Sequence, residues 1–268
     1  MNLLNPPRLD KAAVKKSFNR CATEYDRSAV LQEEVLSRLL ERLEYIKLQP
    51  ETILDLGCGS GAAIKPLLKR YKKSTLVALD MADQMLAVSR KKYGLFDRKC
   101  LLNADMEQLP LKNDCIDLLF SSLALQWSND LAQSMREFKR VGRAGGLLMF
   151  TTFGVNTLKE LRESWSQVDA SPRVHHFMDM HDIGDLMLSA GLSQPVMDME
   201  LLTLQYGSFK ELLADLKSIG ATNADNSRQR GLLTARKLSR LQKAFEQIAY
   251  EDGRYTAPYE IVYGHAWF

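Results

Sequence analysis

The stretch ILDLGCGSGAA, residues 53–63, constrains the fold more than any other part of the sequence. A short apolar run ends in an acid, and Gly57, Gly59 and Gly61 then alternate with small residues. Glycines adopt backbone conformations that other residues avoid, and they let a ligand approach the bare main chain. A strand that ends in such a turn and leads into a helix is typical of nucleotide-binding α/β sheets.

From residue 53 to residue 152, short β-rich runs alternate with helical patterns. Helical spacing separates the runs, as in AAIKPLLKRYKK and DQMLAVSRKKYG, and Asp83 and Asp130 precede helical runs as expected N-caps. This alternation predicts an α/β fold with a doubly wound, mostly parallel, Rossmann-like sheet of seven strands. The predicted strands are 53–56, 75–79, 100–103, 116–121, 146–152, 195–205 and 259–268.

A single domain is expected to span residues 1–268, because the sequence contains no internal repeat and no low-complexity linker. This length is ample for one sizeable core. The expected parts are N-terminal helices at 1–50, a ligand-binding core at 51–155, a helical cap with the remaining sheet at 156–258, and the last strand at 259–268.

Composition disfavours several classes of protein. The formal net charge of +3 does not by itself argue for nucleic acid, and no apolar run approaches the roughly 20 residues of a membrane helix. The first residues lack a signal-type apolar core, and the four cysteines include no closely spaced pair. We therefore expect a cytoplasmic protein with reduced thiols, and we take a monomer as the working hypothesis.

Three kinds of ligand could explain the glycine turn. A phosphate-binding P-loop needs Gly-Lys followed by Ser or Thr, but Gly61 precedes Ala62 and Ala63. A dinucleotide site needs the spacing G-x-G-x-x-G, whereas the spacing here is G-x-G-x-G and Asp55 stands just before it. A carboxylate disfavours a pyrophosphate and suits a cation. S-adenosylmethionine, which carries an ammonium and a sulfonium but no phosphate, fits best.

Two further acids follow predicted strands, at the rim where open α/β sheets bind ligands. Asp80 lies about 20 residues beyond the glycines, the spacing at which an acid accepts both ribose hydroxyls. Asp105 is expected to accept from the adenine amino group, with Met106 against the ring. Each feature also has a structural alternative: a turn residue for Asp80, an N-cap for Asp105 and a tight turn for the glycines.

This ordered set resembles class I S-adenosylmethionine-dependent methyltransferases. The matching segments are LDLGCGSG, the acid of VALD, the AD after the third strand and DLLFSSLALQW at the fourth, within about 50–155. The resemblance implies S-adenosylmethionine as the cofactor, S-adenosylhomocysteine as its product and no metal. The cofactor-binding residues that it implies are Asp55, Gly57, Cys58, Gly59, Gly61, Asp80, Met81, Asp105, Met106, Ser121, Leu123 and Trp127.

The rest of the chain resembles one family of that class, the malonyl-[acyl-carrier-protein] O-methyltransferases of biotin synthesis. The segments VKKSFNRCATEYDRSAVLQ, TTFGVNTLKELRESWSQVDASPRVHHF, LKSIGATN and LTARKLSRLQKAF carry the resemblance, which covers about 12–264. It implies methylation of the free carboxylate of malonyl-acyl carrier protein or malonyl-coenzyme A, which primes pimelate synthesis. Two alternatives share the core: methylation of another small acid or a quinone, and arginine modification by a respiratory-complex assembly factor.

Placement of the substrate is the catalytic task that this chemistry sets. A malonyl carboxylate is already ionised at neutral pH, so no general base is needed. Tyr25 is expected to wall the site, Gln126 to bind the carboxylate or the thioester carbonyl, and Arg173 to pair with the carboxylate. His176 is a further candidate that faces the substrate. The motif HHFMDMHD, residues 175–182, is disfavoured as a metal site because its spacing matches no standard zinc set.

Basic residues cluster in RQRGLLTARKLSRLQK, residues 228–243, which contains no acid. An acidic acyl carrier protein is the expected partner for this cluster, and a solvated helix face is the alternative explanation. No nucleic acid or membrane is expected as a partner. The basic residues are Arg228, Arg230, Arg236, Lys237, Arg240 and Lys243.

Overall fold

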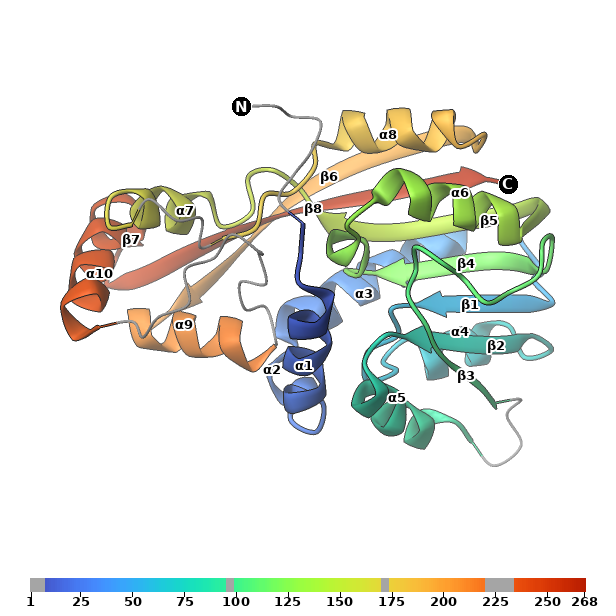
Figure 1. The fold of residues 1–268 in the computed structure, drawn as a ribbon, viewed down its shortest axis with the longest axis horizontal. Helices are drawn as coiled ribbons and strands as arrows, with labels where there is room; N and C mark the ends of the chain where they lie inside the picture. Colours follow the sequence, from blue (N-terminus) through green and yellow to red (C-terminus); the bar gives the residue numbers. More distant parts are fainter. Residues whose placement is uncertain (1–7, 95–98, 170–173, 220–233) are drawn as a thin grey trace.

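The strands of the protein form one mixed sheet. A computed structural model describes residues 8–94, 99–169, 174–219 and 234–268. The strands pair in the order β3-β2-β1-β4-β5-β8-β6, and β7 pairs with β8 outside this path (Figure 1). They are β1 (Thr52–Leu56), β2 (Thr75–Asp80), β3 (Lys99–Asn103), β4 (Ile116–Ser122), β5 (Gly142–Phe153), β6 (Ser193–Tyr206), β7 (Tyr250–Glu251) and β8 (Arg254–Trp267).

Strand directions confirm the doubly wound pattern. The strands from β1 to β5 pair in parallel, whereas β8 runs antiparallel to both β5 and β6. The seven strands of the path from β3 to β6 match the predicted sheet, and β7 is an additional strand of two residues. The last strand begins at Arg254 rather than at 259, because Arg254 pairs with Glu251 across the turn between β7 and β8.

The central strand β1 is buried on both faces. Ile53, Leu54 and Leu56 are each 0% exposed, as expected for a parallel strand that helices cover on both sides. Asp55 interrupts this apolar run with a side chain that is 3% exposed. A carboxylate at such a depth is costly unless it is partnered, so this position needs a functional explanation.

Helices cover both faces of the sheet. The described α-helices are α1 (Lys11–Cys21), α2 (Tyr25–Ser28), α3 (Val30–Arg42), α4 (Ile64–Arg70), α5 (Asp83–Ser89), α6 (Leu131–Val141), α7 (Lys159–Ser166), α8 (Met180–Ser189), α9 (Phe209–Ser218) and α10 (Ala235–Ala249). Short 3-10 helices are η1 (Leu43–Tyr45), η2 (Arg90–Lys92) and η3 (Leu125–Trp127). Leu39 of α3 and Ile64 of α4 pack in one core, and Met135 of α6 and Ile183 of α8 pack in the other.

The start of α6 is capped as the sequence predicts. The carboxylate of Asp130 accepts from the backbone N–H of Gln133 at 2.8 Å. The same prediction for Asp83 is wrong, because Ala82 occupies the N-cap position of α5 and Asp83 lies in its first turn. There the Asp83 carboxylate accepts from the side chain of Asn19 on α1, so it ties the N-terminal helix to the core.

Two long strands, β6 and β8, extend beyond the rest of the sheet and carry α7, α9 and α10 (Figure 1). We call these three helices the cap. Phe209, Phe245 and Tyr255 pack in it with ring centroids 5.3 to 6.3 Å apart. All three helices of the cap lie within residues 156–258, and α8, which lies in the same stretch, packs against α6 and β6 instead. The division of the chain into four parts stays a prediction.

None of the described helices has both the length and the apolar character to span a membrane.

Replacing Asp130 with alanine removes the cap of α6 and leaves a backbone N–H without its partner. We expect the free energy of unfolding to fall by about 1 kcal/mol, measured by urea denaturation. Asp185→Ala, at an exposed position of α8, is the matched control and should change the value little. Equal losses in the two variants would contradict the capping role.

Candidate active site

A cavity lies at the carboxyl ends of β1, β2 and β4. We call it the main cavity. Of the predicted cofactor-binding residues, it is lined by Gly57, Gly59, Asp80, Met81, Asp105, Met106, Leu123 and Trp127. A smaller side hollow adjoins it, and Asp55 and Cys58 line that hollow. Gly57, Gly59 and Tyr25 line both spaces, so the glycine turn separates them.

Two of the predicted cofactor-binding residues, Gly61 and Ser121, line neither space. A Cβ on Gly61 would lie 2.7 Å from Ile64 Cδ1 and 2.8 Å from Ser89 Cβ, so this glycine permits close packing of α4 and α5. Ser121 is 0% exposed, and its hydroxyl donates to a backbone carbonyl of β1 at 2.9 Å. The structure places Ser122 at the cavity instead, because successive side chains of a strand point to opposite faces.

The glycine turn presents bare backbone to the ligand space. Gly57 and Gly59 have positive φ values, +68° and +52°. A Cβ on Gly57 would lie 2.3 Å from Ala124 Cβ, so the turn packs tightly against the segment after β4. A Cβ on Gly59 would meet nothing within 4 Å. The second glycine therefore faces open space, where a ligand can contact the main chain.

Asp80, at the end of β2, holds the glycine turn in place. Its Oδ2 accepts from the N–H of Gly59 at 2.9 Å, and its Oδ1 accepts from the N–H of Ala82 at 2.7 Å. Burial raises the pKa of Asp80, and the backbone hydrogen bonds oppose that shift. Each carboxylate oxygen has a second lone pair, and the residue lines the main cavity. Asp80 can therefore accept ligand hydroxyls while it supports the turn.

Asp55 is the most unusual charged group of the site. Its Oδ2 is buried and has no hydrogen-bond partner. Burial and the nearby charge of Asp80 raise the pKa of Asp55 to about 7. A buried acceptor without a donor is costly, and a cation placed against it removes that cost. The ammonium group of S-adenosylmethionine fits this position, so the residues present suit the cofactor that the fold implies.

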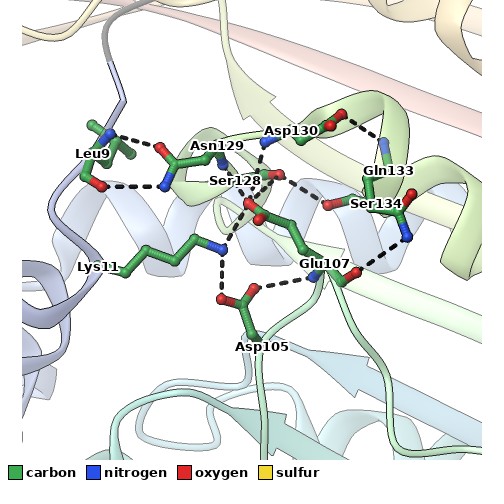
Figure 2. Close-up of polar contacts among 9 residues, drawn as sticks. All are labelled: Leu9, Lys11, Asp105, Glu107, Ser128, Asn129, Asp130, Gln133 and Ser134. Atoms are coloured by element: carbon green, nitrogen blue, oxygen red, sulfur yellow. Dashed lines mark hydrogen bonds and ion pairs between the residues drawn. The ribbon is translucent and has the colours of Figure 1, made fainter.

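The carboxylate of Asp105 pairs with Lys11 of the N-terminal segment, so it is not available to adenine alone. Figure 2 shows Lys11 between two acids, with Nζ 2.5 Å from Asp105 Oδ2 and 2.7 Å from Glu107 Oε1. The other oxygen of Asp105 accepts from the N–H of Glu107 at 3.0 Å, which is a turn contact. Asn129 holds the same segment through paired hydrogen bonds to the backbone of Leu9. The adenine role of Asp105 stays a prediction, in which a ligand shares this carboxylate with Lys11.

A row of aromatic rings joins three distant segments at the main cavity. Phe18 of α1 lies 6.4 Å from Tyr25 and 5.2 Å from Trp127, measured between ring centroids, and Trp127 lies 5.5 Å from His175. All four residues line the cavity. Burial, with a smaller contribution from Asp80, raises the pKa of Tyr25. Its hydroxyl is therefore protonated at neutral pH and can donate a hydrogen bond, but it cannot act as a base.

The other predicted substrate residues differ in whether the structure places them at the cavity. Gln126 lines the cavity, where its Nε2 donates to Leu123 O at 2.6 Å and its Oε1 accepts from Thr152 at 3.3 Å. One N–H of its amide is left for a ligand. His176 is exposed and does not line the cavity, and the neighbouring His175 occupies that place. Arg173 lies outside the described residues.

Part of the cavity wall comes from residues that the sequence analysis did not single out. They are apolar or weakly polar and come largely from the cap and the segments next to it. Helical spacing marks such residues as buried, but it does not show that they face a ligand rather than one another. They include Phe153, Leu158, Leu161, Phe177, Leu216 and Tyr259.

No group of three potential metal ligands occurs among the described residues. In the motif HHFMDMHD, the carboxylate of Asp179 accepts from the backbone N–H of His181 at 2.8 Å, at the start of α8. Asp179 also contacts the ring of His181 at 2.7 Å. The acid therefore caps a helix and is engaged with the histidine that follows it.

The strand order, the glycine turn and the acids near the carboxyl ends of β1 and β2 define a class I S-adenosylmethionine-dependent methyltransferase. Residues 54–150 match the family model described as a methyltransferase domain. A putative methyltransferase of Bacillus halodurans has the same fold, with a TM-score of 0.63 at 18% identity, over 87% of this chain and 97% of that one.

Two curated proteins resemble the chain over nearly its whole length. A malonyl-[acyl-carrier protein] O-methyltransferase of Halorhodospira halophila is 46% identical over 100% of this chain and 91% of its own. A protein of the same name from Gallionella capsiferriformans is 45% identical over 97% of this chain and 91% of its own. The chain belongs to the malonyl-[acyl-carrier protein] O-methyltransferase family.

Replacing Asp55 with asparagine tests the cost of its buried charge. Between pH 4 and pH 7 the folded state holds a proton that the unfolded state has released, so stability of the wild type falls across this window as pH rises. Asp55→Asn should therefore raise the free energy of unfolding by about 1–3 kcal/mol at pH 8, and by less at pH 5. Urea denaturation at both values measures this. An equal gain at the two pH values would contradict the ionisation of Asp55.

Proposed function

We propose that the protein methylates the free carboxylate of malonyl-acyl carrier protein and yields the malonyl methyl ester. The observation that supports this proposal is the 46% identity to a malonyl-[acyl-carrier protein] O-methyltransferase over the entire chain, including the cap that lines the cavity. In this role the product primes pimelate synthesis for biotin. S-adenosylmethionine is the methyl donor and S-adenosylhomocysteine the second product.

The glycine turn and the acids around it would hold the cofactor. When bound there, S-adenosylmethionine supplies a methyl group on a positively charged sulfur. Asp55 would face the ammonium group, Asp80 the ribose hydroxyls, and Met81, Met106 and Leu123 would enclose the nucleoside. Cys58 contributes to the wall of the side hollow. These roles follow from where the side chains lie and from the charge that each presents.

The cavity wall would supply the remaining catalysis by placement and by exclusion of water. Phe153, Leu158 and Phe177 make part of the wall apolar, and an apolar environment favours a transfer that neutralises an anion and a cation. The remaining N–H of Gln126 and the hydroxyl of Tyr25 would donate to the substrate carboxylate. Trp127 would press against the sulfonium by cation–π attraction. No residue needs to remove a proton, because the nucleophile is already ionised.

The direct test is mass spectrometry of malonyl-acyl carrier protein after incubation with the protein and S-adenosylmethionine. We expect one added methyl group, removed by mild ester hydrolysis, and no change in acetyl-acyl carrier protein, which lacks the free carboxylate. Succinyl-acyl carrier protein, tested in parallel, shows how strictly the protein selects the length of the acyl chain. An unmodified malonyl form, with S-adenosylmethionine still bound, would overturn the choice of substrate but not the fold.

Helix α10 presents the proposed docking surface for the carrier protein. Arg236, Arg240 and Lys243 are exposed, and their spacing of four and three residues places them on one face of the helix. Lys237 lies off this face and pairs with Asp169 at 3.1 Å. Arg228 and Arg230 lie outside the described residues. A stripe of three exposed cations suits the negatively charged helix surface of an acyl carrier protein.

Charge reversal tests this surface. In Arg236→Glu/Arg240→Glu we expect the KM for malonyl-acyl carrier protein to rise roughly tenfold or more, since like charges oppose docking. The kinetics with malonyl-coenzyme A should stay unchanged, because that substrate has no protein surface. Lys65→Glu/Lys69→Glu, an exposed pair at the same spacing on α4, is the control. Equal losses on both substrates would refute docking at α10.

A further inference from the structure

A second buried acceptor lies beside Asp55 in the side hollow. Gln32, on the first turn of α3, lines both the side hollow and the main cavity. Its Oε1 is buried and has no hydrogen-bond partner, as is true of Asp55 Oδ2. Buried polar atoms without partners are uncommon in folded proteins, and each one needs an explanation. Here two of them border the same small space.

The charge of the hollow indicates which ligand group would satisfy them. The ionisable side chains with a formal charge that are described in its lining are Asp26, Glu33 and Asp55, all of them acids. Asp26 already pairs with Lys92 at 2.7 Å. No lysine or arginine is among the described lining residues, so a carboxylate would be repelled here and a cation attracted. An ammonium group also brings three N–H donors to a space that holds two unpaired acceptors.

The position of the hollow ties this cation to the methyltransferase cofactor. Gly57 and Gly59 line both spaces, so a ligand with its nucleoside in the main cavity can reach past the glycine turn into the side hollow. The amino-acid end of S-adenosylmethionine carries the required ammonium group. The inference therefore rests on the cofactor part of the proposed function, and it is independent of which acid is methylated.

We propose that Gln32 binds the cofactor through its side-chain carbonyl, which accepts from the ammonium group of the methionine part alongside Asp55. This makes α3, which precedes the sheet, part of the cofactor site. Tyr25 and Gln32 then both join the N-terminal helices to the same ligand. Cofactor binding would accordingly add a contact between the N-terminal helices and the ligand at the edge of the sheet.

The test is calorimetry of S-adenosylhomocysteine and 5′-methylthioadenosine with Gln32→Leu. We expect S-adenosylhomocysteine to bind roughly ten- to hundredfold more weakly, the range for hydrogen bonds to a charged group. The affinity for 5′-methylthioadenosine, which lacks the amino acid, should not change. The affinity for an analogue that keeps the amine but lacks the carboxylate should fall by the same factor as the affinity for S-adenosylhomocysteine. The affinity for an analogue that keeps the carboxylate but lacks the amine should not change.

Controls separate this role from a structural one. Gln84→Leu, at an exposed position of α5, should bind every ligand as the wild type does. A loss of 5′-methylthioadenosine affinity equal to that of S-adenosylhomocysteine would overturn the proposal, since Gln32 would then only support the fold. A loss confined to the carboxylate analogue would also overturn it. If the wild type bound none of these ligands, the cofactor assignment itself would fail.

Discussion

The burial of the Asp55 carboxylate, close to the charge of Asp80, is the constraint on which the site depends. The two acids lie near the carboxyl ends of neighbouring strands, Asp55 buried within β1 and Asp80 half-buried at the end of β2. Asp80 is compensated by backbone N–H groups from the glycine turn and from the start of α5. Asp55 has no such compensation at Oδ2. The protein thus carries one buried carboxylate oxygen without a partner, and the proposed cationic ligand would supply one.

Close packing and a hydrogen bond fix the backbone of the glycine turn. Gly57 packs against Ala124 with no room for a side chain, and Gly59 is held by Asp80. The turn therefore keeps its shape without a ligand. A preorganised site of this kind loses little conformational entropy when the ligand binds. In the proposed site, the stability that the free protein loses at Asp55 would be regained when the cofactor's ammonium group binds there.

The central sheet could be predicted from the sequence because its strands are covered on both faces. Such strands produce continuous apolar runs, and the predicted limits of β1 and β2 differ from the observed ones by a single residue at one end. The start of β8 was less evident, because its first part lies beside the cap and alternates in burial. The acids after β1 and β2 were found because their order along the chain carries chemical meaning.

Other parts of the site could not be predicted, because they depend on contacts between distant segments. Lys11 meets Asp105 across 94 residues, and no local pattern marks this pair. The choice between Ser121 and Ser122, or between His175 and His176, depends on a side-chain direction that spacing alone does not resolve. Gln32 was missed because a single glutamine in an amphipathic helix has no distinctive pattern. Its significance comes only from the atoms that surround it.

The 14-residue strands β6 and β8 have a consequence for how this architecture can diversify. Each extends for about 45 Å, roughly three times the length of β1, so the ribbon that they form reaches from the core into the cap. The cap is thereby anchored by main-chain hydrogen bonds instead of a hinge. Changes in the helices on the outer half of the ribbon would therefore leave the parallel strands and the glycine turn in place. Substitutions in the cap and in the parallel core would then act on different parts of one cavity wall.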